Sequence, residues 1–278
     1  MPLRIVQSQQ NGRLKQLRRA LSRPGSGESG LVAIEGPNLL AEAVRTGLRI
    51  ATVFVAQGSQ RLLDAVELPT ETEILLLPPE LLAGAMTTET PQPIAALVHP
   101  PDWHWEKLWE SDESVPLMLV LAGLQDPGNL GTILRSAEAF GATGIVSLPG
   151  TVTEWNPKAM RASAGSLFRM PVVRQDPFEC IRLLREAGLK IWVADPVGAQ
   201  AAIDVDLAAG VALIIGNEGN GVPPEIAEKA DGAITIPCPG PVESLNAAAA
   251  ASILLYEASR QRTANATSPH QKRKRSAR

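Results

Sequence analysis

The feature that most restricts the fold is a series of five short apolar runs in the second half of the sequence. They are PLMLVLAGL, TGIVSLP, LKIWVAD, VALIIGN and AITIPC, each bounded by turn residues. Helical segments separate most of them, and this alternation is typical of parallel strands joined by crossover helices. Because each run is apolar throughout, both faces of the sheet must be covered. The pattern predicts an α/β domain with a parallel sheet over residues 116–262, closed by a last helix in LNAAAAASILLYEASRQR.

A weaker alternation of the same kind occupies the first hundred residues. LVAIEG, ATVFVA and EILLLP are predicted strands, and PNLLAEAVRTG and the segment near RLLDAV are predicted helices. Leucines at helical spacing within residues 1–23 predict a basic amphipathic helix. We therefore expect a small α/β domain with its N-terminal helix and a linker in 1–110, a larger α/β domain in 116–262, and a disordered basic tail in 263–278.

Composition excludes several classes of protein. With 45% apolar residues among 278, the chain can bury a core and is not globally disordered. We expect no secretory signal, because the N-terminal segment has no apolar core, and no apolar run reaches the roughly 18 residues of a membrane span. Its two cysteines, Cys180 and Cys238, are too few for a disulfide framework and too far apart for a metal motif. We expect a cytoplasmic protein with no membrane partner and no metal.

Charge is unevenly distributed along the chain. The net charge is only −3, yet residues 1–23 hold six lysines and arginines, among them Arg13 and Lys15, and no acid. The sequence also ends in KRKRSAR. Such basic blocks attract polyanions, with nucleic acid as the first candidate. For the tail alone, a solvated flexible end is an equally good interpretation.

Three strand ends carry unusual residues, and ligands of parallel α/β sheets bind beyond the carboxyl ends of strands. The first end is LQDPGNLGTILRSAEAF, where a helix is expected to begin near Gly128. Gly128, Gly131 and Arg135 then share a face, so a bulky ligand has room beside the cation. The alternative is a pair of turn glycines and a surface ion pair between Arg135 and Glu138.

The other two ends are loops rich in glycine and proline. LIIGNEGNGVP has Glu218 at its centre but lacks the lysine of a phosphate loop and the spacing of a dinucleotide motif. Glu218 is a candidate site residue, with a solvated turn residue as the alternative. In ITIPCPGPVESLNAAAAA, Ser244 is expected to cap a helix, which leaves the Asn246 side chain free at the helix entrance.

Taken together and in this order, the three stretches resemble the motifs of the SpoU (TrmH-type) RNA 2′-O-ribose methyltransferases of the SPOUT superfamily. The family has an Asn-to-Arg stretch, a glycine-rich loop with Glu, and a proline-rich loop ending in Ser-x-Asn. The matching residues here are Asn129, Arg135, Glu218, Ser244 and Asn246. NPKAMRASAGSLFRMPV is also similar to the family, and LVAIEGPNLLAEAV and TPQPIAALV resemble its substrate-binding domain.

The resemblance implies a catalytic domain with a deep trefoil knot that binds S-adenosyl-L-methionine, with Gly216, Ile236 and Leu245 lining the pocket. It implies a homodimer whose active site is completed across the interface. RNA is expected to contact the first domain and the family-like segment. The residues expected to bind RNA are Arg13, Lys15, Lys158, Arg161 and Ser163.

The implied reaction is methylation of a ribose 2′-hydroxyl, and ribosomal RNA is the expected substrate. Arg135 would activate the hydroxyl, either as a base or as a cation that stabilises the alkoxide; a guanidinium does not readily give up its proton. Asn129, Glu218, Ser244 and Asn246 would hold the nucleotide and Arg135 in place.

Three other functions are compatible with parts of this pattern. Transfer RNA is an alternative substrate. A non-catalytic RNA-binding protein with the same fold is a second alternative, although a binder has no need of the full motif set. A nucleotide-dependent enzyme that uses GNEGNG for phosphates is a third, but it lacks a phosphate-loop lysine and an acidic metal cluster.

Overall fold

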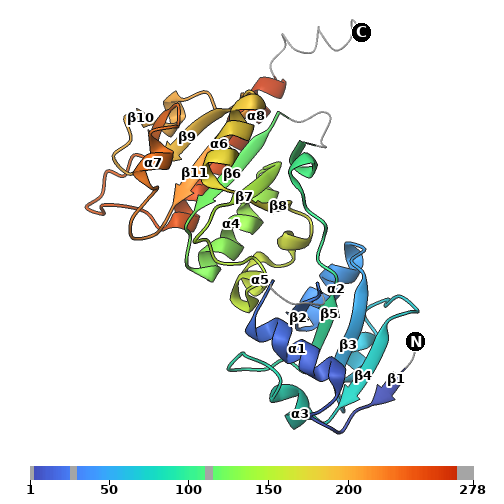
Figure 1. Ribbon diagram of the computed structural model, residues 1–278. Helices are drawn as coiled ribbons and strands as arrows, with labels where there is room; N and C mark the ends of the chain where they lie inside the picture. The colour runs from blue at the N-terminus through green and yellow to red at the C-terminus, as the bar shows by residue number, and fades with distance from the viewer. Residues whose placement is uncertain (1–2, 26–29, 110–114, 268–278) are drawn as a thin grey trace, which may run out of the picture. The chain divides into compact units, whose positions relative to one another are not determined.

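The computed structural model describes residues 3–25, 30–109 and 115–267 (Figure 1). These residues form two compact units. The first contains the described residues of 1–102 together with 153–169, and the second contains those of 103–152 and of the chain from 170 on. The segment 153–169 therefore packs with the first unit although it follows the start of the second in the sequence. The predicted boundaries at 110 and 116 stay a prediction.

The first unit is built on a mixed five-stranded sheet in the order β1-β4-β3-β5-β2. Its strands are β1 (Leu3–Ile5), β2 (Val32–Glu35), β3 (Ile50–Ala56), β4 (Glu73–Leu77) and β5 (Ile94–Val98). β1, β4 and β3 are parallel, whereas β5 runs antiparallel to both β3 and β2. The strand predictions for β2, β3 and β4 are confirmed. No strand was predicted for β1, which is three residues long, or for β5.

Helices cover this sheet. They are α1 (Gly12–Ser22), α2 (Pro37–Arg45), α3 (Pro79–Ala83) and α5 (Pro157–Ser163), with short 3-10 turns η1 (Gln60–Leu63) and η3 (Ser166–Phe168). The N-terminal helix begins later than predicted, because Asn11 accepts hydrogen bonds from the main-chain N–H groups of Arg13 and Leu14 and so caps α1. Its predicted leucine stripe is buried in the core.

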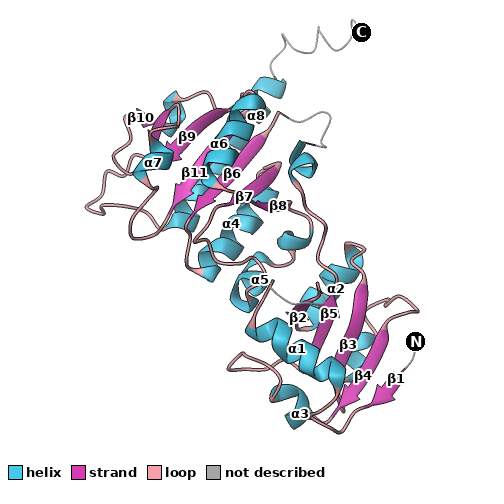
Figure 2. Ribbon diagram, in the orientation of Figure 1, coloured by secondary structure: helices cyan, strands magenta, loops and turns pink. Residues whose placement is uncertain are grey.

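The second unit contains a seven-stranded parallel sheet in the order β10-β12-β9-β11-β6-β7-β8 (Figure 2). The strands are β6 (Leu117–Ala122), β7 (Gly144–Ser147), β8 (Val172–Arg174), β9 (Lys190–Ala194), β10 (Gln200–Ala201), β11 (Val211–Gly216) and β12 (Gly232–Thr235). Five of them are the five predicted apolar runs, so the parallel α/β prediction is confirmed. The strands β8 and β10 were not predicted, because they have only three and two residues and so show no periodicity in the sequence.

Helices lie on both faces of this sheet. They are α4 (Pro127–Ala139), α6 (Pro177–Glu186), α7 (Pro224–Ala227) and α8 (Ala247–Thr267), with 3-10 turns η2 (Trp105–Trp109) and η4 (Ala202–Asp204). One core joins α6, α7 and η2 to alternate residues of the central strands. The intervening strand residues are buried as well, on the face covered by α4 and α8.

α4 and α8 lie side by side in the same direction. Asn246 contacts Asn129, the Ser136 and Ser252 hydroxyls are 2.7 Å apart, and Phe140 meets the Tyr256 ring edge-on with centroids 5.8 Å apart. These contacts follow the same order along both helices. The pairing places the entrance of α8, where the third motif ends, beside the entrance of α4, which holds the first motif.

α8 continues to Thr267 and so includes the first five residues of the predicted tail, 263–267; residues 268–278 lie outside the described residues. Within the described parts of the chain, no helix is both long and apolar enough to cross a membrane. The trefoil knot stays a prediction.

Candidate active site

Glu218 connects the loops that follow two neighbouring strands, β11 and β6. Its Oε1 accepts hydrogen bonds from the Asn129 side-chain amide (3.0 Å) and the Asp126 main-chain N–H (3.1 Å). Its Oε2 accepts one from the Gln125 main-chain N–H (3.1 Å). These contacts span about ninety residues of sequence. Glu218 is therefore not merely a solvated turn residue.

The hydrogen bonds also determine the protonation of Glu218. Partial burial opposes the charged form, but the N–H groups of Asn129, Gln125 and Asp126 all favour it, so the pKa of Glu218 lies below its ordinary value. The carboxylate is an anion at neutral pH and accepts hydrogen bonds only. It can position a neighbouring group, but it is poorly suited to donate a proton.

Asn246 extends this arrangement to the third motif. Its amide donates to the Asn129 side-chain carbonyl over 3.0 Å, and its own carbonyl accepts from the main-chain N–H groups of Ala248 (2.9 Å) and Ala249 (3.3 Å). The expectation that Ser244 caps the last helix is thus wrong. Asparagine is as good a cap as serine, and only Asn246 also reaches Asn129. Ser244 lies exposed in the loop before the helix.

The glycine-rich loop is held in shape by Asn217, which sequence reasoning did not single out. The Asn217 side chain donates to the Gly123 carbonyl (2.7 Å) and accepts from the N–H groups of Gly219 (2.9 Å) and Asn220 (3.0 Å). Its main chain exchanges two further bonds with Gly221. An asparagine directly after a strand and before glycines is typical of a side-chain-closed turn, and this could have identified it.

The three predicted cofactor residues lie on different segments. A Cβ on Gly216 would clash with the main-chain carbonyl of Gly221, so only glycine fits at this position of the loop. Ile236 and Leu245 are half-buried at the two ends of the exposed segment 237–244. Among the described residues, no backbone–backbone hydrogen bond ties 236–245 to another segment.

These observations fit a methyl donor that is recognised mainly by main-chain groups. The Ile236 carbonyl accepts a hydrogen bond from the Cys238 thiol. The other carbonyls of 236–245, and the N–H groups of its non-proline residues, could bind the donor, and Gly216 can offer main-chain atoms alone. The assignment of Gly216, Ile236 and Leu245 to the donor stays a prediction.

Arg135 stands apart from the cluster of Glu218, Asn129 and Asn246. It is exposed on α4, and no hydrogen bond or ion pair of the described residues joins it to these three side chains. Gly131 is buried, because the sheet and α8 cover α4 on two sides, so the expected bare glycine face beside Arg135 is not formed there. A single chain brings together three of the five predicted catalytic residues.

The predicted RNA-binding residues belong to the first unit. Lys15, Lys158 and Arg161 are exposed. Arg13 is half-buried, with its guanidinium 3.1 Å from Glu73. Ser163 is fully buried and donates to the Met160 carbonyl (2.8 Å), which leaves no surface for RNA, and we withdraw it from the set.

Within the described part of the chain, no three His, Cys, Asp or Glu residues gather as metal ligands. The second unit is thus a parallel α/β enzyme fold with a polar cluster at the carboxyl ends of its strands, which is where such folds bind and transform their ligands.

Comparisons with known proteins define the family. The SpoU rRNA Methylase family matches residues 116–256, and the MRM3-like substrate binding domain matches residues 11–96. The chain is 32% identical over 254 residues to the 23S rRNA (guanosine(2553)-2′-O)-methyltransferase RlmP of Bacillus subtilis (strain 168), covering 91% of this chain and 98% of that protein.

Solved structures agree with this match. The SpoU methyltransferase AviRb from Streptomyces viridochromogenes, in complex with AdoMet, is 30% identical with a TM-score of 0.80 and covers 91% of this chain and 99% of its own. The AdoMet-bound rRNA methyltransferase from Sinorhizobium meliloti is 27% identical, also with a TM-score of 0.80, and covers 93% and 98%.

The chain belongs to the SpoU rRNA methylase family. It is an RNA 2′-O-ribose methyltransferase that acts on ribosomal RNA and uses S-adenosylmethionine as its methyl donor.

Proposed function

We propose that the chain methylates the ribose of a guanosine in ribosomal RNA at the cluster of Glu218, Asn129 and Asn246. The observation that carries this proposal is the convergence of all three motif loops on one hydrogen-bonded chain, from Glu218 through Asn129 to Asn246. The nucleoside is suggested by RlmP, whose name specifies a guanosine and which matches this chain over nearly its whole length.

The residues of this chain orient the acceptor. S-adenosylmethionine, when bound, supplies an electrophilic methyl group. The amides of Asn129 and Asn246 each have a second N–H that the cluster does not use, and we assign these to the target ribose and its phosphate. Glu218 fixes the Asn129 amide, so the donors are oriented before RNA arrives. Such alignment lowers a barrier by roughly 7–11 kcal/mol in favourable cases.

Arg135 is exposed on α4, away from the cluster of its own chain. On the neighbouring helix α8, the side chains of Ile253 and Tyr256 are 42% and 55% exposed. We propose that two copies pair through this α4–α8 face and that each Arg135 serves the cluster of the other. As a cation it would stabilise the negative charge that develops on the 2′-oxygen while the hydroxyl proton passes to solvent water. Ser244, in the exposed segment 237–244 that precedes α8, would contact the same nucleotide.

The first unit would bind the RNA. Lys15, Lys158 and Arg161 present exposed cations there, and phosphate contacts of this kind supply most of the affinity for RNA. We place the enzyme in the cytoplasm, where ribosomes are assembled, with domains in 1–110 and 116–262 and a basic tail after 262.

The test is methylation of ribosomal RNA purified from cells that lack the gene, with labelled S-adenosylmethionine and mapping of the modified ribose. We expect one methylated guanosine. Incorporation into transfer RNA alone, or none into ribosomal RNA, would overturn the proposal.

A further inference from the structure

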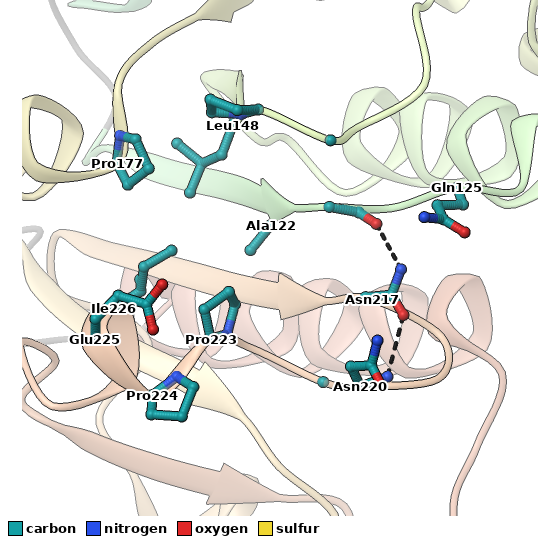
Figure 3. Close-up of a pocket in the computed structure, with 14 residues that line it drawn as sticks. Ala122, Gln125, Leu148, Pro177, Asn217, Asn220, Pro223, Pro224, Glu225 and Ile226 are labelled. Carbon is teal, nitrogen blue, oxygen red and sulfur yellow. Dashed lines mark hydrogen bonds between the residues drawn. The ribbon is translucent and has the colours of Figure 1, made fainter.

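A cavity of about 470 Å³ opens beside the glycine-rich loop, and the site described above does not use it. Its size lies within the roughly 300–1,000 Å³ of small-ligand pockets. It lies between the segments that follow β6, β7 and β11 (Figure 3). From the end of β6 the chain continues to β7 on one side, whereas from β11 it continues to β12 on the other. Ligands of open α/β sheets bind where the connections diverge in this way.

The cavity is distinct from the predicted donor position. Ile236 follows β12, and β9 separates β12 from β11. The cavity lies on the opposite side of β11, toward β6, and neither Ile236 nor Leu245 lines it. The turn 217–221, which directly follows Gly216, lines the cavity through Asn217, Asn220 and Gly221.

The walls suit a flat, uncharged group. Leu148 and Pro177 lie on one side and Pro223, Pro224 and Ile226 on the other, and the Ala122 methyl group points between them (Figure 3). Among the described residues that line the cavity, Glu225 carries the only charge and there is no cation. A phosphate would therefore be repelled, whereas a base can be held between apolar side chains.

The rim of the cavity joins it to the polar cluster. Gln125 lines the cavity, and its main-chain N–H donates to Glu218. Asn220 lines it as well, in the turn that carries Glu218. A nucleotide whose ribose lies at Asn129 thus has its base within reach of this cavity, because the same two loops form both places.

We propose that the cavity receives the guanine base of the target nucleotide, with the Glu225 carboxylate accepting hydrogen bonds from N1–H and the N2 amino group. This inference rests on the proposed function. A carboxylate has only acceptors, and guanine offers two adjacent N–H donors on this edge, whereas adenine has an acceptor at N1. The exposed amides of Gln125 and Asn220 can donate to O6. Extruding the base from its stack is the usual route by which such a pocket is filled.

The experiment compares Glu225→Gln with the matched control Glu228→Gln, an exposed carboxylate at the other end of α7 that does not line the cavity. Substrates are the unmethylated rRNA fragment that contains the target guanosine and the same fragment with inosine or adenosine at that position. We expect Glu225→Gln to lower kcat/KM on guanosine by roughly 10- to 100-fold and to reduce the preference over adenosine. Inosine lacks the amino group. The decrease in kcat/KM on replacing guanosine with inosine should therefore be smaller for Glu225→Gln than for the wild type. Glu228→Gln should match the wild type throughout.

A second variant, Ala122→Leu, fills the cavity from its floor. It should reduce turnover of RNA while the melting temperature and the affinity for S-adenosylhomocysteine stay at wild-type values. If both variants keep wild-type kcat/KM and guanosine preference, the cavity assignment is overturned. Loss of S-adenosylhomocysteine binding in Ala122→Leu would overturn it too, since the cavity would then hold the donor. A wild-type enzyme that methylates no rRNA guanosine would instead overturn the proposed function.

Discussion

Asn129 and Asn246 are 117 residues apart in the sequence, yet the Asn246 amide donates a hydrogen bond to the Asn129 side-chain carbonyl over 3.0 Å. The bond links the entrance of α4 to the entrance of α8. Because Glu218 accepts from the other end of the Asn129 amide, all three motifs depend on the orientation of one side chain.

The two tasks of Asn246 can be separated by substitution. Asn246→Asp keeps an oxygen that caps α8, so the melting temperature should stay near that of the wild type. Its carboxylate would face the Asn129 carbonyl without a donor, and methylation should fall at least about 100-fold, as when a positioned hydrogen bond at a reacting centre is lost. Asn246→Ala should in addition lose about 1 kcal/mol of stability. Full activity in Asn246→Asp, measured with labelled donor, would contradict the role of this bond.

The protonation of Glu218 gives a pH dependence whose sign can be derived. The pKa of the folded state lies below the ordinary 4.5, so Glu218 stabilises the fold above that pH and loses its contribution as pH falls through the folded value. Glu218→Gln should lower the free energy of unfolding by no more than about 1 kcal/mol at pH 7, since the carboxylate is partly solvated.

That difference should be constant from pH 6 to 8 and shrink below pH 4.5, in urea titrations of the wild type and variant. A difference that grows as the solution is acidified would show that Glu218 has the opposite shift.

The sequence alone predicts much of the fold and of the site, and there are physical reasons why it does not predict the rest. The five apolar runs of the second unit and the motif residues Asn129, Glu218 and Asn246 were identified because strand burial and loop chemistry leave local patterns. The missed strands β1, β8 and β10 have only two or three residues and carry no such pattern, whereas β5 is an apolar run, IAALV, that could have been recognised. Asn246 caps α8 through local hydrogen bonds, whereas its bond to Asn129 depends on the tertiary fold and could not be read from the sequence. Gly216 is required by the backbone of its own turn, a contact that composition does not reveal.

Supply of Arg135 by a second copy predicts complementation between inactive variants. Arg135→Ala and Asn246→Asp homodimers should each be nearly inactive. Mixed dimers contain one site with neither change, so co-expression should restore up to about a quarter of the wild-type activity, because half the dimers are mixed and each has one intact site of two. No recovery in purified, doubly tagged mixed dimers would place Arg135 in the site of its own chain. Size-exclusion chromatography of each variant controls for loss of the dimer.

The two cysteines should differ sharply in reactivity. Burial, together with the nearby Asp176, raises the pKa of Cys180 to about 12, so little reactive thiolate forms at pH 8. Cys238 is exposed in the segment assigned to the methyl donor. Iodoacetamide should modify Cys238 alone, as read by mass spectrometry, and S-adenosylhomocysteine should slow this reaction. Modification of Cys238 at the same rate with and without S-adenosylhomocysteine would remove the segment 237–244 from the donor site.

The end of α8 is held by Arg262, which donates to the carbonyls of Val115, Pro116, Leu207 and Ala209. Burial lowers the pKa of Arg262, and these acceptors compensate for the charge inside the protein. Arg262→Met should therefore reduce the free energy of unfolding by about 2–3 kcal/mol, because the carbonyls lose a charged donor. Arg182→Met is the control, since Arg182 on α6 forms ion pairs with Glu179 and Glu186 in which all three side chains are exposed. Equal midpoints for the two variants in urea would mean that Arg262 does not anchor the helix; a lower midpoint for Arg262→Met alone would show that the last helix depends on the start of β6.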